Sequence, residues 1–261
     1  MNSQDTPQKN ASNEVDTKIK LYAEWDDLNL NEDVHRGILS YGFEKPTSIQ
    51  QKAIKPIIDG KDIIGQAQSG TGKTGSFTIG CLQRIDLTES TTQAIILSNT
   101  HILAQQTYNV VNNLSKYMDG LVTKMLIGGT SVSDDINDLH NRKPHIIVGT
   151  PGRVFDMMKR RHFDTSSIRL FIMDEADEML NKGFKEQIYE IFRYLNDNVQ
   201  VALFSATMPE EILTLTDKFL RNPVRITLKA EDVTLKGIKQ FYIAVSTDQE
   251  KFDCLKDLYE C

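Results

Sequence analysis

Cysteine is scarce in this chain, and its few copies form no pattern that binds a metal or builds a disulfide framework. The three cysteines are Cys81, Cys254 and Cys261, an odd number without metal-ligand spacing. Disulfide-stabilised secreted domains are usually dense in paired cysteines. We therefore expect a reduced, intracellular protein, most simply a cytoplasmic one.

Long apolar runs and an excess of positive charge are also missing. No segment approaches the roughly 20 apolar residues that span a bilayer. The N-terminus lacks the apolar stretch of a signal peptide, so we expect no membrane partner. The net charge of −6 argues against a globally basic nucleic-acid binder, although local basic surfaces or backbone donors stay possible.

The length and apolar content are sufficient for one large α/β domain. The chain has 261 residues, and 39% of them are hydrophobic, which allows a substantial buried core. We expect a disordered tail over 1–20 and a domain over 21–228, because the first segment is polar and charged. A charged, polar stretch over 229–237 is interpreted as a linker.

Beyond residue 62, apolar strands alternate with amphipathic helices, which indicates a doubly wound parallel sheet. The expected strands are 63–66, 94–98, 122–127, 145–149, 170–173, 201–204 and 224–228. The expected helices of this region are 73–84, 102–117, 132–140, 153–160, 184–195 and 210–219, preceded by helices at 31–41 and 48–58. In such sheets, ligands bind beyond the carboxyl ends of the strands.

A loop of small residues between an expected strand and an expected helix has the context of a phosphate-binding loop. Its N–H groups and the helix dipole would face a triphosphate, Lys73 would reach the β- and γ-phosphates, and Thr74 would hold Mg²⁺. A plain surface turn is the alternative, which the Gly-Lys-Thr ending disfavours. The usual pattern opens with glycine where Ala67 stands. The expected phosphate-binding residues are Ala67, Gln68, Ser69, Gly70, Thr71, Gly72, Lys73 and Thr74.

An acidic motif follows the apolar run 170–173. At the end of this strand, Asp174 is expected to bind Mg²⁺ together with Thr74, partly through water. Glu175 is expected to polarise the attacking water as a general base, with Lys73 and Asp174 as the other catalytic residues. An acidic helix N-terminus is the structural alternative. Its position about a hundred residues after a phosphate loop favours the catalytic interpretation.

The sequence Asp-Glu-Ala-Asp at 174–177, with the loop 67–74 upstream, resembles the DEAD-box RNA helicases. The likeness runs from about Trp25 to the end of the chain. It implies a RecA-like, doubly wound, mostly parallel sheet with helices on both faces, as in P-loop NTPases. It also implies ATP and Mg²⁺ as cofactors, with ATP hydrolysis coupled to RNA binding and local duplex unwinding.

The segment 42–50 resembles the family's Q motif, which reads adenine, within a region of about 23–51. The amide of Gln50 suits the N6 and N7 edge of adenine, whereas a solvated glutamine within a helix is the alternative. Phe43 would stack on the base, a role compatible with one as a core aromatic. Trp25 stands where the family usually has Phe, so packing against this region is expected.

The segment Ser205-Ala206-Thr207 resembles the motif that couples hydrolysis to unwinding. Its two hydroxyls are expected to bond Asp177 and so link the nucleotide site to the RNA face. An ordinary N-cap at Thr207 is the structural alternative.

Three further segments correspond to RNA-contacting motifs of the family. A helix is expected to open at Arg153, so that its first N–H groups would grip a phosphate. The segment 98–104 departs from the family's Pro-Thr-Arg-Glu-Leu-Ala, because Asn99, His101 and Ile102 replace Pro, Arg and Glu. A mostly neutral His101 cannot grip a phosphate as arginine does. The expected RNA-binding residues are Thr100, Gly128, Gly129, Thr150, Gly152 and Arg153.

The remaining basic and histidine residues carry no expected site. The run 159–161 is interpreted as a solvated helix end stabilised by the helix dipole. The histidines at positions 35, 140, 145 and 162 show no ligand spacing.

Residues 238–261 are expected to be a truncated start of a second RecA-like domain. A strand over 240–245 and a helix over 249–259 are too few to form a domain. No segment matches the family's arginine finger. The first interpretation is an RNA helicase represented by its ATP-binding half, with RNA (single-stranded or a short duplex) and translation initiation factors as partners. The alternative is a non-enzymatic module that binds ATP, RNA or an initiation factor.

Overall fold

The computed structural model describes residues 20–260, apart from 182, 217–218 and 229–240. The tail expected at 1–20 therefore lies outside the described residues except for Lys20, and the linker expected at 229–237 lies wholly outside them. Within the described ranges, no helix is long and apolar enough to cross a membrane.

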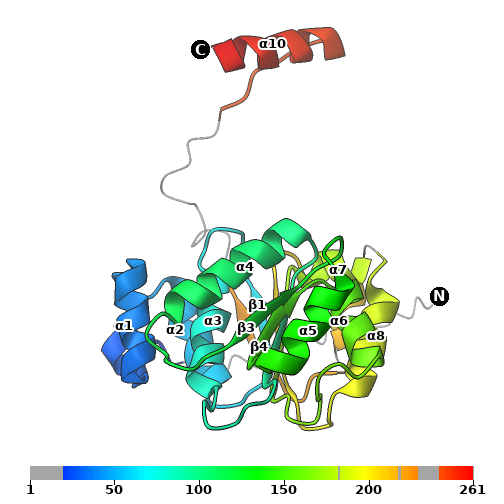
Figure 1. Ribbon diagram of the computed structural model, residues 1–261. Coiled ribbons are helices and arrows are strands. Elements are labelled where there is room, and N and C mark those ends of the chain that lie inside the picture. The colour runs from blue at the N-terminus through cyan, green and yellow to red at the C-terminus, as the bar shows by residue number, and fades with distance from the viewer. Residues whose placement is uncertain (1–19, 182, 217–218, 229–240, 261) are drawn as a thin grey trace, which may run out of the picture.

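One parallel sheet of seven strands forms the centre of the molecule (Figure 1). Its strand order is β3-β4-β2-β5-β6-β1-β7. The strands are β1 (Ile63–Gln66), β2 (Ala94–Leu97), β3 (Thr123–Leu126), β4 (Ile146–Gly149), β5 (Leu170–Asp174), β6 (Gln200–Ser205) and β7 (Val224–Thr227). This confirms the expected doubly wound α/β fold.

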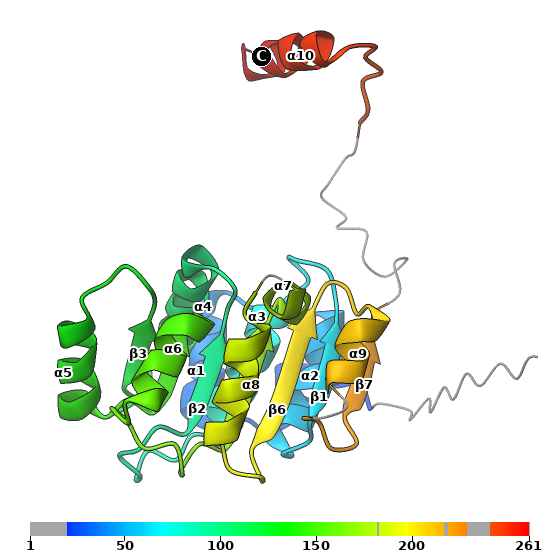
Figure 2. The same cartoon turned by 90° about the vertical axis from the view of Figure 1, so that its right-hand side faces the viewer.

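Helices cover both faces of the sheet (Figure 2). On one face lie the short helix η1 (Trp25–Leu28), α1 (Glu32–Tyr41), α2 (Ser48–Ile58), α3 (Lys73–Arg84) and α4 (His101–Leu114). On the other lie α5 (Val132–Arg142), α6 (Pro151–Lys159), α7 (Ala176–Asn181), α8 (Lys185–Tyr194) and α9 (Glu210–Thr216). The last helix, α10 (Asp248–Glu260), has no buried residue.

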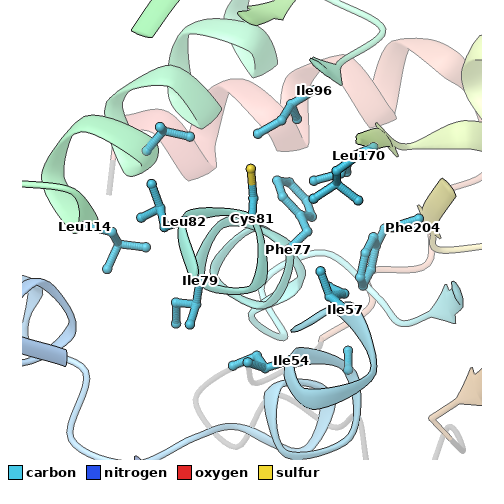
Figure 3. Packing of buried hydrophobic residues seen from close by; sticks show 14 of the residues in the cluster. Ile54, Ile57, Phe77, Ile79, Cys81, Leu82, Ile96, Leu114, Leu170 and Phe204 are labelled. Atoms are coloured by element: carbon cyan, nitrogen blue, oxygen red, sulfur yellow. The ribbon is translucent and has the colours of Figure 1, made fainter. Parts of the chain in front are cut away.

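The two cores follow from the alternation of side chains along each strand. In β2, Ile96 belongs to the core under α1–α4, whereas Ile95 belongs to the core under α5–α9. Such strands are apolar throughout because both faces are covered. Figure 3 shows the first core around α3, where Phe77 lies beside Phe204 of β6 with ring centroids 5.4 Å apart.

Parallel pairing brings the carboxyl ends of the strands to one edge of the sheet in two neighbouring groups. Strands β1, β6 and β5 are adjacent, with Gln66 opposite Ser205 and Asp174 opposite Phe204. Strands β2, β4 and β3 form the other group, with Gly149 opposite both Leu97 and Leu126. The first group carries the expected nucleotide motifs, and the second group carries the expected RNA motifs.

Several expected boundaries differ from the structure. Helix α6 begins at Pro151 rather than Arg153, because proline is well tolerated at the first helical position. Helices η1 and α7 were not expected from the sequence. The strand expected at 240–245 is wrong for the described part, since 241–245 has no strand. A strand needs a hydrogen-bonded neighbour, and no described strand pairs with this segment.

Candidate functional site

The loop between β1 and α3 adopts a backbone that only glycine accommodates easily. Gly70 has φ 80° and Gly72 has φ 101°, both in the left-handed region. Ala67, which stands where the usual pattern has glycine, is buried, and its N–H donates to the carbonyl of Ser205 at 3.0 Å. The small side chain at this position therefore fits between β1 and β6.

Lys73, the first residue of α3, and Glu175, directly after β5, meet across the loop. The Lys73 Nζ lies 3.0 Å from Glu175 Oε1, and the Lys73 side chain is only 5% exposed. The Ser69 hydroxyl also donates to Glu175 at 3.3 Å. Glu175 has φ 54°, an uncommon conformation for a residue with a Cβ, which costs of order 1 kcal/mol and is typical of functional sites.

Asp174 is the last residue of β5 and is buried beside this ion pair. Burial raises the pKa of Asp174 to about 6, although the Lys73 ammonium opposes that rise. Its Oδ1 accepts a hydrogen bond from the Glu175 N–H at 3.1 Å. The three expected catalytic residues are therefore brought together, and the buried carboxyl would gain from a nearby cation.

The expected adenine-reading segment packs directly on the phosphate loop. Gln50 is buried in the first turn of α2, which excludes the alternative of a solvated glutamine, and its Nε2 donates to the Gly72 carbonyl at 3.4 Å. Its Oε1 accepts from the Thr47 N–H at 2.9 Å, closing a capping box. A Cβ on Gly75 would lie 2.6 Å from Gln50 Nε2, so this contact requires glycine.

The predicted packing of Trp25 on this region is confirmed. Its indole N–H donates to the Phe43 carbonyl at 3.1 Å, and the two rings stack with centroids 6.3 Å apart. The Tyr41 ring meets Phe43 edge-on at 4.8 Å. These contacts fix the half-buried Phe43 beside α3, where a Cβ on Gly75 would come within 3.1 Å of its ring.

The predicted hydrogen bond between the β6 and β5 motifs is present. The Thr207 hydroxyl donates to Asp177 in α7, and the Ser205 hydroxyl also bonds this carboxylate. Burial favours the neutral form of Asp177, but these two hydroxyl bonds, together with backbone N–H bonds from Glu178 and Thr207, outweigh it and hold its pKa below the ordinary value. The contact joins the segment after β6 to α7, the helix that follows β5.

A second concave site lies at the ends of β2, β4 and β3. It is an open pocket of about 350 Å³, and its lining includes four of the six expected RNA-binding residues. Its lining is Asn99, His101, Gly128, Thr150, Gly152, Arg153, Asp156 and Phe184. The pocket lies between the N-termini of α4 and α6.

The backbone supplies donors to this pocket. Thr150 is the N-cap of α6 without a capping bond from its side chain, and Pro151 has no N–H. The N–H groups of Gly152 and Arg153 then stand in the first turn, where they have no intrahelical acceptor. Such groups bind anions at helix N-termini.

The Arg153 side chain is engaged inside the protein. Its guanidinium pairs with the buried Asp135 of α5 and donates to both Thr130 oxygens, each at 3.0 Å. Asp135 also binds Lys124 of β3 at 2.9 Å. The network holds the Gly128–Gly129 turn against α6, and no spacing in the sequence pointed to Asp135.

The remaining expected RNA residues lie around the α4 N-terminus. The Thr100 hydroxyl caps α4 by accepting from the Leu103 N–H at 3.2 Å. His101 is exposed, and a Cβ on Gly128 would lie 3.3 Å from its Nε2. Ile102 is 72% exposed, so the residue replacing the family's glutamate lies largely outside the core. Gly129 has φ 80°.

Comparison with known proteins defines the class of this chain. Residues 47–215 match the DEAD/DEAH box helicase family, and the chain belongs to that family. The match includes the loop 67–74, the acidic motif 174–177 and the segment 205–207.

Two relatives of the same kind match most of the chain. ATP-dependent RNA helicase eIF4A of Scheffersomyces stipitis and of Debaryomyces hansenii are each 55% identical over 236 residues, which is 90% of this chain. The chain spans 59% of the length of these relatives.

Among solved structures, S. cerevisiae Dbp5 bound to RNA and ADP BeF3 is 32% identical, with a TM-score of 0.82 over 91% of this chain and 60% of that chain. A DEAD box protein from Methanococcus jannaschii is 35% identical, with a TM-score of 0.77 over 91% of this chain and 63% of that chain.

Proposed function

We propose that this chain is the ATP-binding half of an ATP-dependent RNA helicase, which couples ATP hydrolysis to RNA binding and local duplex unwinding. The observation that carries the proposal is the convergence of Lys73, Asp174 and Glu175 beside a glycine-shaped loop. A purely structural module would gain nothing from a buried lysine, a buried carboxyl and a strained glutamate at one point. Membership of the helicase family favours the enzyme over the binding module.

In this proposal, Lys73 exchanges Glu175 for the β- and γ-phosphates of ATP. The released Glu175 then orients water as a general base. Gln50 and Phe43 hold the adenine, since both already lie against the loop and α3. The phosphates face the N–H groups of 67–74 and the N-terminus of α3.

Magnesium is the second proposed cofactor. The Thr74 hydroxyl and the Asp174 carboxylate are oxygen donors, the class that Mg²⁺ prefers, and burial of Asp174 makes a cation partner favourable. Bound Mg²⁺ would neutralise charge on the phosphates during transfer. Asp174 would hold the ion partly through water, as Mg²⁺ usually keeps several waters.

RNA is the proposed substrate at the pocket between α4 and α6. Its phosphates would meet the first-turn N–H groups of Gly152 and Arg153 and the open Gly129 turn, with Thr100 and Thr150 at the two caps. The Thr207–Asp177 bond would transmit the state of the nucleotide site toward this pocket. The relatives named for eIF4A suggest translation initiation factors as protein partners.

Calorimetric titration of ATP–Mg²⁺ tests the nucleotide site. Lys73→Ala should weaken binding by about 1.5–3 kcal/mol, roughly ten- to a hundredfold, because a charge-assisted contact is lost. Lys116→Ala removes an exposed lysine just beyond the C-terminal end of α4 and should leave affinity unchanged. Equal affinity of the wild-type chain and Lys73→Ala would contradict the proposed site.

A further inference from the structure

Two histidines that are 22 residues apart in the chain face each other at the edge of the sheet opposite the nucleotide site. His140 lies near the end of α5, and His162 follows the end of α6. Helices of a parallel α/β sheet run against the strands, so both helices end at the amino edge of the sheet. The two rings are tilted by 51° with centroids 5.4 Å apart.

The separation of the two facing nitrogens is informative. His162 Nδ1 lies 3.4 Å from His140 Nε2, the distance of a long hydrogen bond between the two rings. Zinc–imidazole bonds of about 2.0–2.1 Å at a tetrahedral angle place two ligand nitrogens about 3.4 Å apart. An octahedral ion with similar bonds would require about 3.0 Å. The observed distance therefore fits the bite of a tetrahedral ion.

The surroundings of the pair leave space for the rest of a coordination shell. Both histidines line a pocket of about 390 Å³ whose polar lining also includes Asp164, Lys143 and the hydroxyl residues Ser90, Thr91 and Thr92. The Thr91 hydroxyl is buried and has no hydrogen-bond partner among the described residues. An ion-bound water would be a suitable partner for it.

We infer that His140 and His162 form a binding site for a borderline transition-metal ion of the Zn²⁺ type. Neutral imidazole is a preferred ligand of such ions, whereas Mg²⁺ prefers oxygen. Across the described ranges no group of three His, Cys, Asp or Glu side chains is arranged to hold a metal, so waters complete the shell. The bound ion joins the ends of α5 and α6, the helices that carry Asp135 and Arg153.

The test is zinc titration of the 261-residue chain in excess Mg²⁺, which occupies oxygen-rich sites. A Cys254→Ser, Cys261→Ser background removes the accessible thiols. We expect one zinc ion per chain. His140→Ala and His162→Ala should each weaken binding at least about tenfold, since even outer-shell changes cost ten- to a hundredfold. His35→Ala, on α1, is the matched control and should bind as the parent does.

Imidazole ¹⁵N chemical shifts provide a readout that does not depend on variants. Zinc should shift Nε2 of His140 and Nδ1 of His162 and leave His35 and His101 unchanged. Unchanged affinity in both single variants, or zinc-induced shifts confined to other histidines, would overturn the inference. Binding of inorganic phosphate but not zinc at this pair would overturn it as well.

Discussion

The two halves of the carboxyl edge of the sheet are built from different chemical groups. Around β1, β5 and β6, charged side chains converge, and Lys73 and Glu175 contact each other directly. Around β2, β3 and β4, the cations Arg153 and Lys124 are paired with the buried Asp135, and the pocket presents backbone N–H groups and an exposed His101. In the proposed function, the first half acts on a bound phosphoryl group, whereas the second half binds a nucleic-acid backbone without changing it.

This difference fits what each proposed ligand requires. Transfer of a phosphoryl group needs charges placed within a few ångströms of the reacting atoms. Recognition of a nucleic-acid backbone needs donors at phosphate spacing, which helix N-termini supply irrespective of sequence. The comparison can be tested by changing each half separately.

The largest expected effect concerns a charge that neither half supplies. Asp174 and Glu175 can position Mg²⁺ and water, but no described arginine faces Lys73 from the far side of the loop. The relatives are longer than this chain. Joining it to an eIF4A-like second domain should raise RNA-stimulated ATP turnover by roughly a thousand- to a hundred-thousandfold, the usual contribution of an arginine finger.

The control for that fusion is Glu175→Gln, which should abolish the restored turnover while retaining ATP binding. The chain alone should turn ATP over slowly and unwind no duplex, because closure of two domains couples RNA binding to hydrolysis. Rapid RNA-stimulated turnover by residues 1–261, unchanged by the fusion, would contradict the prediction.

The second effect tests the inward-facing Arg153. Arg153→Gln should lower the free energy of unfolding by about 3 kcal/mol, because the buried Asp135 carboxylate loses its guanidinium partner and keeps only Lys124 and the Thr130 hydroxyl. Urea unfolding measures the loss, and a cycle with Asp135→Asn isolates the pair. Arg160→Gln, which breaks a surface pair with Asp156, should cost less than about 1 kcal/mol.

RNA binding of the same Arg153 variant sharpens the comparison. We expect the salt dependence of single-strand binding to stay unchanged, because the guanidinium is engaged with Asp135. A fall of about 0.7 in the log–log slope would instead show that the side chain moves onto a phosphate when RNA binds.

The sequence predicted the first half of the edge better than the second for a physical reason. Residues 67–74 and 174–177 are contiguous motifs whose roles follow from local geometry, a strand end followed by a turn. The inward turn of Arg153 depends on Asp135, and the His140–His162 contact joins the ends of two helices. Neither is encoded in local spacing. Thr47 followed three residues later by Gln50 is a local capping-box pattern, and the structure forms this box at the start of α2.

The strand boundaries followed from the same logic. Apolar runs covered on both faces gave β1–β7 to within a residue or two, since burial alone defines such strands. The segment 241–245 is equally apolar, yet it forms no strand because pairing, which no local pattern reports, decides the outcome.

A third, smaller effect concerns the bond between β6 and α7. Thr207→Val should destabilise the chain by about 1–3 kcal/mol, because Asp177 loses a hydroxyl donor. The pKa of Asp177 is lowered in the folded chain, so this stabilisation is complete above the ordinary value of 3.8 and is lost as pH falls through the folded pKa. The stability difference between wild type and Thr207→Val, measured by urea unfolding, should therefore shrink below pH 3.8. Thr207→Ser keeps the hydroxyl and should retain most of the stability.

The smallest expected effect tests whether the second half can be given the charge that it lacks. His101 is exposed at the start of α4 and lies beside the Gly128 turn. His101→Arg should tighten single-stranded RNA binding a few-fold and steepen its salt dependence by about 0.7 in log–log slope, which corresponds to one added phosphate contact. His35→Arg adds the same charge on α1, away from the pocket, and should change neither quantity beyond a weak general attraction. Fluorescence anisotropy over a salt series measures both the affinity and its salt dependence.

Equal slopes in His101→Arg and His35→Arg would mean that position 101 does not face RNA, and the proposed path of the RNA backbone between α4 and α6 would then be wrong. A steeper slope in His101→Arg alone would show that this half of the edge contacts phosphate. It would also show that the pocket lacks a positive charge toward RNA because of the single side chain at position 101.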